Sequence, residues 1–164
     1  MLAIFLIIFE NMLSILRTDS SHPDFIELVK QLDAYLAELD GEEHAFYNKL
    51  NVITHIKHVI VVYENDKPAA CGAIRNFGTD SMEVKRMYTL PEMRGKGIAQ
   101  MVLAELEKWA AELGYKKCIL ETGKRQPEAI RLYEKNGYKI IPNYGEYLNI
   151  ENSVCFEKNF KIIG

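Results

Sequence analysis

The sequence has few cysteines and histidines and no excess of basic residues, and each shortage excludes a class of protein. Cys71, Cys118 and Cys155 are odd in number and widely spaced, with no CxxC motif or Cys/His cluster. The sequence therefore supports neither a disulfide framework nor a metal site. Each cysteine lies in an apolar segment, which predicts a small buried side chain in a reducing cytoplasm. The net charge of −3 gives no reason to expect a nucleic-acid partner, because such domains usually carry a basic excess.

Long hydrophobic runs are also missing, apart from one at the N-terminus. The apolar run of residues 1–9 is too short to span a bilayer as a helix. It has no basic segment before it and no small-residue cleavage site after it, so it is a poor secretory signal. We interpret residues 1–11 as an apolar extension and predict a folded domain over residues 12–160, with no membrane partner. A membrane or dimer contact through the extension is the competing interpretation, and a homodimer remains open.

The rest of the chain alternates between strand-like and helical patterns. Apolar residues recur at helical spacing from Phe25 to Leu39, after a capping-box pattern formed by Ser21 and Asp24. The expected helices are 25–39, 42–50, 98–113 and 126–135, and the expected strands are 12–17, 55–63, 68–76, 82–90, 115–122, 138–141 and 153–158. We predict a single α/β domain with a mixed, mostly antiparallel sheet of about six to seven strands and about four flanking helices. The helix after residue 97 connects two strands that we expect to be a central parallel pair.

The most informative stretch joins the strand that ends before Pro91 to the helix that begins after Gly97. Between them lies the turn Arg94-Gly-Lys-Gly97. A glycine-rich turn at a helix N-terminus is typical of an anion site, because its backbone N–H groups and the helix dipole favour negative charge. The turn does not match the phosphate loop GxxxxGK[ST]. It also lacks the third glycine of a dinucleotide fingerprint, since Gln100 stands there.

The spacing Arg94-x-x-Gly97-x-Ala99 resembles the acyl-CoA-binding signature of the GNAT-type N-acetyltransferase superfamily. It is preceded by Val84-Lys-Arg-Met-Tyr88, and Ala129-Ile-Arg-Leu-Tyr-Glu-Lys-Asn-Gly-Tyr138 resembles the family's second conserved segment. The resemblance covers residues 82–138 and implies transfer of an acetyl group from acetyl-CoA to a primary amine of a small molecule or peptide. Direct attack in a ternary complex, without a metal, is the implied mechanism. A non-catalytic acyl-CoA-binding regulatory module of the same fold is the alternative.

The resemblance also assigns residues to the acetyl-CoA. The pyrophosphate would meet the turn, and the amides of pantetheine would pair with the backbone of the preceding strand. Gln126 stands where the family often has Asn, which puts that contact in doubt. Lys124, Arg125 and Arg131 are candidates for the 3′-phosphate. The implied cofactor-binding residues are Met87, Tyr88, Thr89, Arg94, Gly95, Lys96, Gly97, Ile98, Ala99, Gln126 and Ala129.

Two residues are the implied catalytic groups. Tyr133 stands where the family has a tyrosine near the sulfur, and a phenol is a credible proton donor to the leaving thiolate. Glu83 stands where several members carry a general base, and would deprotonate the amine through a water. An acidic corner at Glu38, Asp40, Glu42 and Glu43 favours a cationic acceptor. The candidate acceptor-pocket residues are Tyr144, Glu146, Tyr147 and Cys155.

Overall fold

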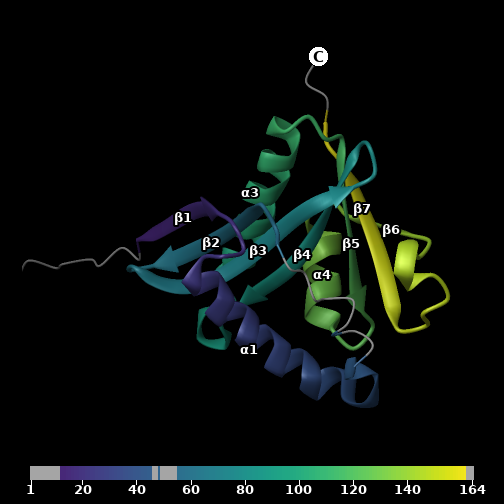
Figure 1. The fold of residues 1–164 in the computed structure, drawn as a ribbon, viewed down its shortest axis with the longest axis horizontal. Helices are drawn as coiled ribbons and strands as arrows, with labels where there is room; N and C mark the ends of the chain where they lie inside the picture. Colours follow the sequence, from purple (N-terminus) through teal and green to yellow (C-terminus); the bar gives the residue numbers. More distant parts are fainter. Residues whose placement is uncertain (1–11, 46–47, 49–54, 162–164) are drawn as a thin grey trace, which may run out of the picture.

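The fold is built on one mixed β-sheet (Figure 1). The computed structural model describes residues 12–45, 48 and 55–161. Within these residues the sheet has seven strands in the order β1-β2-β3-β4-β5-β7-β6. The strands are β1 (Leu13–Thr18), β2 (His58–Glu64), β3 (Lys67–Phe77), β4 (Ser81–Thr89), β5 (Lys117–Gly123), β6 (Lys139–Ile141) and β7 (Ser153–Asn159). The α-helices with described bounds are α1 (Pro23–Asp40), α3 (Ile98–Glu112) and α4 (Pro127–Lys135). The predicted α/β fold is confirmed.

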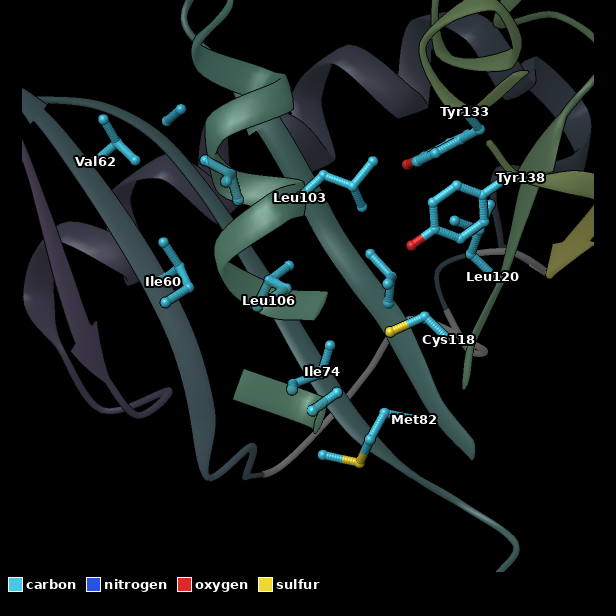
Figure 2. Packing of buried hydrophobic residues seen from close by; sticks show 14 of the residues in the cluster. Ile60, Val62, Ile74, Met82, Leu103, Leu106, Cys118, Leu120, Tyr133 and Tyr138 are labelled. Carbon is cyan, nitrogen blue, oxygen red and sulfur yellow. The ribbon is translucent and has the colours of Figure 1, made fainter. Parts of the chain in front are cut away.

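The two faces of the sheet are covered by different helices, because side chains alternate along each strand. On β2, Val59 and Val61 pack with the apolar face of α1, whereas Ile60 and Val62 pack with α3. Figure 2 shows the second of these cores, where Leu103 and Leu106 of α3 face the strands. Tyr133 of α4, the predicted proton donor, belongs to this same core. Each helix is therefore fixed against the sheet by an apolar stripe.

The predicted parallel pair is formed by β4 and β5, but it is short. Ser81, Met82 and Glu83 pair with Lys117, Cys118 and Ile119. Beyond these pairs, β4 continues to Thr89 and β5 continues to Gly123, with no ladder pair between them in the described chain. The two strands therefore separate, and the carboxyl half of β4 keeps only β3 as a sheet neighbour.

A β-bulge in β4 accompanies this separation. Cys71 pairs with Tyr88 and Ala73 pairs with Lys85, so the single residue Gly72 of β3 lies opposite two residues of β4. Arg86 in the bulge has φ of 59°, a left-handed conformation that is uncommon for a residue with a Cβ atom. Its guanidinium donates to Asp33 Oδ1 of α1 at 2.7 Å, and its carbonyl accepts from Cys71 Sγ at 3.4 Å. The bulge is thus attached to both β3 and α1.

Met87, the second residue of the bulge, explains why β3 has a glycine at position 72. Met87 and α3 together fill the space above Gly72: a Cβ there would lie 2.5 Å from Met87 Sδ and 2.7 Å from Val102 Cγ1. Real Cβ atoms do not approach other atoms so closely. Only glycine at position 72 lets the bulge pack beneath α3.

The loop between β6 and β7 is held on β4 by two side-chain hydrogen bonds. Tyr144 Oη donates to Glu83 Oε2 at 2.6 Å, and Lys85 Nζ donates to Tyr147 Oη at 3.1 Å. Arg75 Nε donates to the other oxygen of Glu83 at 2.8 Å. We call the five residues Arg75, Glu83, Lys85, Tyr144 and Tyr147 the loop anchor. It fixes the β6–β7 loop, which carries the predicted acceptor-pocket residues Tyr144 and Tyr147, at the level where β4 and β5 separate; we call this loop the acceptor-side loop after that prediction.

Several details of the sequence prediction were wrong or fall outside the described residues. His22, not Ser21, caps α1, and its Nδ1 accepts from the N–H of Asp24 at 3.1 Å. Of the short helix expected over residues 42–50, residues 46, 47, 49 and 50 lie outside the described residues; the others begin in a 3₁₀ turn over Gly41–Glu43 and are α-helical at His44, Ala45 and Asn48. Leu113, which the helical spacing of Ile98, Val102, Leu106 and Trp109 predicts on the same apolar stripe, is 44% exposed, and the buried stripe of α3 includes Leu103 and Ala110 instead. The three cysteines are buried and free, as predicted. No described helix has the length and apolar character needed to cross a membrane.

Replacing Gly72 with alanine tests the packing of the bulge. We expect Gly72→Ala to lose about 1–3 kcal/mol of unfolding free energy, because the added methyl group must displace Met87 or Val102. Urea denaturation of both proteins measures the loss. A variant within about 0.5 kcal/mol of the parent would show that the bulge does not need a glycine opposite it.

Removing the hydroxyl of Tyr144 tests the loop anchor. Tyr144→Phe leaves a carboxylate that is 1% exposed without one of its donors, and we expect a loss of about 1–3 kcal/mol. Tyr63→Phe is the matched control, because Tyr63 Oη donates to Asp24 at the same 2.6 Å, but Asp24 is 40% exposed. Denaturation should show a smaller loss for the control. Equal losses would mean that burial of Glu83 adds nothing to the bond.

Candidate active site

The separation of β4 and β5 opens a cleft of about 450 Å³. Its walls come from α1, the bulged half of β4, the turn before α3, the end of β5 and the first turns of α4. The lining residues are Leu32, Tyr35, Leu36, Asp40, Val84, Lys85, Arg86, Met87, Tyr88, Thr89, Arg94, Gly95, Ala99, Glu121, Thr122, Gly123, Gln126, Glu128, Ala129, Leu132, Tyr133 and Asn152. Segments distant in the sequence therefore meet in one concave site at the carboxyl ends of two parallel strands, where α/β sheets commonly bind ligands.

The turn before α3 has the geometry of an anion site. Gly95 and Gly97 have φ of 79° and 78°, and the positions of their absent Cβ atoms are open. Gly97 is the N-cap of α3, so the free N–H groups of the first helical turn and the helix dipole lie beside it. Arg94 Nε donates to the carbonyl of Thr89 at 3.1 Å, and its guanidinium lies over the rings of Tyr35 and Tyr88. These contacts hold a positive charge at the mouth of the cleft.

Most of the predicted cofactor-binding residues lie along this cleft, and three do not. Those that line it are Met87, Tyr88, Thr89, Arg94, Gly95, Ala99, Gln126 and Ala129. Lys96 Nζ instead forms an ion pair with Glu64 at 3.3 Å, and the side chain of Ile98 is buried in the core at 1% exposure. Gly97 also does not line the cleft, and the binding role of these three residues stays a prediction.

The predicted acid Tyr133 lies in the wall of the cleft. It is 6% exposed and packs edge-on against Tyr138, with ring centroids 5.7 Å apart (Figure 2). Burial, with a smaller effect from the charge of Glu121, raises the pKa of Tyr133. The side chain therefore stays a protonated phenol at neutral pH, which is the form that a proton donor needs.

The predicted base Glu83 lies elsewhere. It is 1% exposed, belongs to the paired segment of β4 and is absent from the cleft lining. Both of its carboxylate oxygens accept hydrogen bonds, one from Arg75 and the other from Tyr144. Its role as a base stays a prediction, and the observed contacts give it a structural one.

The other predicted residues surround the site without lining it. Tyr147 is buried in the loop anchor, and Glu146 beside it is exposed. Cys155 is buried on β7 opposite Glu121, and burial raises the pKa of its thiol to about 11, so it is a poor nucleophile. Arg125 forms an ion pair with Glu43 at 3.3 Å. Lys124 and Arg131 are exposed.

Two charged residues in the cleft, Lys85 and Glu121, were given no role by the sequence analysis, whereas Asp40 belongs to the predicted acidic corner. Burial is the main cause that raises the pKa of Glu121, to about 7, and it also raises the pKa of Asp40. Burial lowers the pKa of Lys85, although Glu83 and Glu121 oppose this change. For Glu121, the only hint in the sequence is that a carboxylate ends the otherwise apolar strand segment Cys118-Ile-Leu-Glu121. A strand glutamate usually faces solvent, so only the separation of β4 from β5 shows that Glu121 faces a cleft.

Comparisons with known proteins agree with this architecture. The family model described as the acetyltransferase (GNAT) family matches residues 16–138. The uncharacterized N-acetyltransferase YjgM of Escherichia coli is 38% identical over 84 residues, which are half of each chain. The IAA acetyltransferase of Azospirillum brasilense is 30% identical over 139 residues, covering 81% of this chain and 88% of its own.

A solved structure supports the same assignment. A Klebsiella pneumoniae protein, solved as a candidate acyl-CoA N-acyltransferase, superposes with a TM-score of 0.75 at 30% identity. The match covers 90% of this chain and 97% of that one. The family match spans both halves of the cleft, from β4 and the Arg94–Ala99 turn to α4. This chain is a member of the GNAT family of acetyltransferases.

Proposed function

We propose that this protein transfers the acetyl group of acetyl-CoA to a primary amine of a small molecule or peptide, by direct attack in a ternary complex. The observation that carries the proposal is the cleft itself, which brings an anion-binding turn, an unpaired strand edge and a buried tyrosine into one site. Acetyl-CoA supplies an activated thioester. The Klebsiella neighbour, a candidate acyl-CoA N-acyltransferase, supports an acyl-CoA donor.

The cleft fits the shape and chemistry of coenzyme A. A pyrophosphate suits the Arg94–Ala99 turn, because two glycines with open surroundings let an anion approach the backbone N–H groups. The pantetheine arm carries amides, and the edge of β4 that faces away from β3 has no ladder partner beyond Glu83 in the described residues. Met87, Tyr88 and Thr89 on this edge line the cleft and can pair with those amides like an added strand.

Tyr133 is the proposed proton donor to the leaving sulfur. It lies on α4 one turn beyond Ala129 and two beyond Gln126, and all three line the cleft. Attack of the amine nitrogen on the thioester carbon breaks the C–S bond, and the thiolate takes the phenol proton. The raised pKa of Tyr133 keeps the phenol protonated throughout the neutral range and makes it a weaker acid than an ordinary tyrosine, so it donates only as negative charge develops on the sulfur.

The acceptor end of the cleft favours a cationic amine. Asp40 and Glu121 both line it, and the C-terminus of α1, where Asp40 is the last residue, adds negative potential from the helix dipole. Lys85 offsets part of this charge. The free buried cysteines suit a reducing compartment, and we propose that the protein acts in the cytoplasm.

A charge placed at the turn tests the pyrophosphate site. Gly95→Asp adds a carboxylate beside the proposed pyrophosphate, so we expect the Kd for acetyl-CoA to rise roughly tenfold or more, equivalent to about 1.4 kcal/mol. Gly78→Asp is the matched control, because Gly78 has a similar φ of 74° and similarly open surroundings but does not line the cleft. Calorimetric titration measures both. Equal affinities in the two variants contradict the assignment of the turn.

Loss of the phenol tests the acid role. We expect Tyr133→Phe to lower kcat by roughly 100-fold, with little change in acetyl-CoA binding, because only proton transfer is removed. Thiol release across a panel of amines measures kcat, and thermal stabilisation by acetyl-CoA measures binding. Unchanged turnover would show that another group protonates the thiolate. Binding without thiol release from the parent protein would identify the non-catalytic acyl-CoA module instead.

A further inference from the structure

Two glutamates lie near the point where β4 and β5 separate, and only one is accessible from the cleft. Glu83 pairs with Ile119 in the last rung of the parallel ladder. Glu121 lies two residues further along β5, beyond that rung, and lines the cleft together with Tyr133. An amine entering the cleft therefore meets the carboxylate of Glu121.

Glu83 is already committed to the loop anchor. Arg75 donates to one oxygen at 2.8 Å and Tyr144 to the other at 2.6 Å, and the carboxylate is 1% exposed. Protonation of Glu83 would remove the negative charge that strengthens both of these bonds. Since Tyr144 belongs to the β6–β7 loop, protonation of Glu83 would weaken one of the two hydrogen bonds that hold this loop on β4.

The groups that face Glu121 come from every element around it. Lys85 and Glu83 lie on β4, Asp40 on α1, Ser153 on β7, and the phenols of Tyr133 and Tyr147 on α4 and the β6–β7 loop. Burial raises the pKa of Glu121 to about 7, Lys85 and Ser153 lower it, and Glu83 and Asp40 raise it further. A carboxylate with this balance can accept a proton at neutral pH and release it again.

On the basis of the proposed acetyl transfer, we infer that Glu121 takes the proton of the acceptor ammonium, and that Glu83 is a positioning residue that holds the acceptor-side loop through Tyr144. The ammonium gives one proton to Glu121, and the neutral nitrogen forms the C–N bond as the C–S bond breaks. The thiolate takes the proton of Tyr133. The proton that nitrogen sheds as the amide forms restores the phenol, so Glu121 holds the one proton that leaves for solvent.

The variants Glu121→Gln and Glu83→Gln separate the two roles. For the amine with the fastest thiol release, we expect Glu121→Gln to lower kcat/KM roughly 100-fold and to abolish the rise in kcat/KM that has its midpoint near pH 7. We expect Glu83→Gln to keep this pH dependence and to raise the KM for the amine, because its loop is displaced. Glu134→Gln, on the exposed side of α4, is the control for loss of a surface charge.

Stability provides a readout that does not depend on turnover. The pKa of Glu121 in the folded protein lies above its ordinary value, so ionisation of Glu121 destabilises the fold as the pH rises through about 7. Glu121→Gln should therefore have a higher Tm than the parent at pH 8, and the difference should shrink towards pH 5. Glu83→Gln should lower Tm at both pH values, because it breaks the loop anchor.

The outcomes distinguish this inference from the proposed function. A parent protein that binds no acetyl-CoA, or releases no thiol with any amine, overturns the proposed function. The inference is overturned if the parent is active, Glu121→Gln keeps the rise in kcat/KM near pH 7 and Glu83→Gln loses this rise. Glu121→Asp retains the carboxylate and should keep the rise in kcat/KM near pH 7 with a reduced kcat. Loss of this rise in Glu121→Asp also contradicts the role of Glu121.

Discussion

The separation of β4 from β5 is the feature on which the rest of the site depends. After the pair Glu83–Ile119, neither strand contributes a further rung to the other. A parallel ladder that continued to Thr89 would close the cleft and bury the edge that we assign to pantetheine. The bulge at Arg86 and Met87 accompanies the divergence, and it is fixed on one face by Asp33 and on the other by the space above Gly72. The position of this cleft wall is therefore set by the packing of the bulge against α1 and α3.

The charged groups at the level of this separation perform different tasks according to their access to the cleft. Glu83 is enclosed and fully bonded, so its charge supports the loop. Glu121 faces the cleft with a raised pKa, so its charge costs stability and is available for proton transfer. Lys85 interacts with both carboxylates and donates a hydrogen bond to Tyr147. Functional sites commonly keep such strain where the surrounding fold can tolerate it.

Local patterns predicted most of the fold and the acetyl-CoA end of the site. The hairpin of β2 and β3, the crossover through α3 and the turn at Gly95 and Gly97 follow from residues close in sequence. The helical spacing of Gln126, Ala129 and Tyr133 placed them together, and all three line the cleft.

The acceptor end could not be predicted in the same way. The exposure of Glu121 depends on where two strands diverge, and the burial of Glu83 depends on Arg75 and Tyr144, which approach from other segments. Strand alternation places Glu83 on a face but does not show what covers that face. Even the helix cap required tertiary context, because Ser21 bonds to Asp19 and leaves His22 to cap α1.

Backbone hydrogen exchange in the presence of coenzyme A tests the central claim most directly. If the pantetheine arm pairs with the edge of β4 that faces away from β3, and the pyrophosphate occupies the Arg94–Ala99 turn, coenzyme A should slow the exchange of amides in residues 87–89 and 95–99. Amides of β2, which has strand partners on both sides, should change little. Saturating coenzyme A without slower exchange in these two segments, or with protection confined to other parts of the chain, would contradict the account.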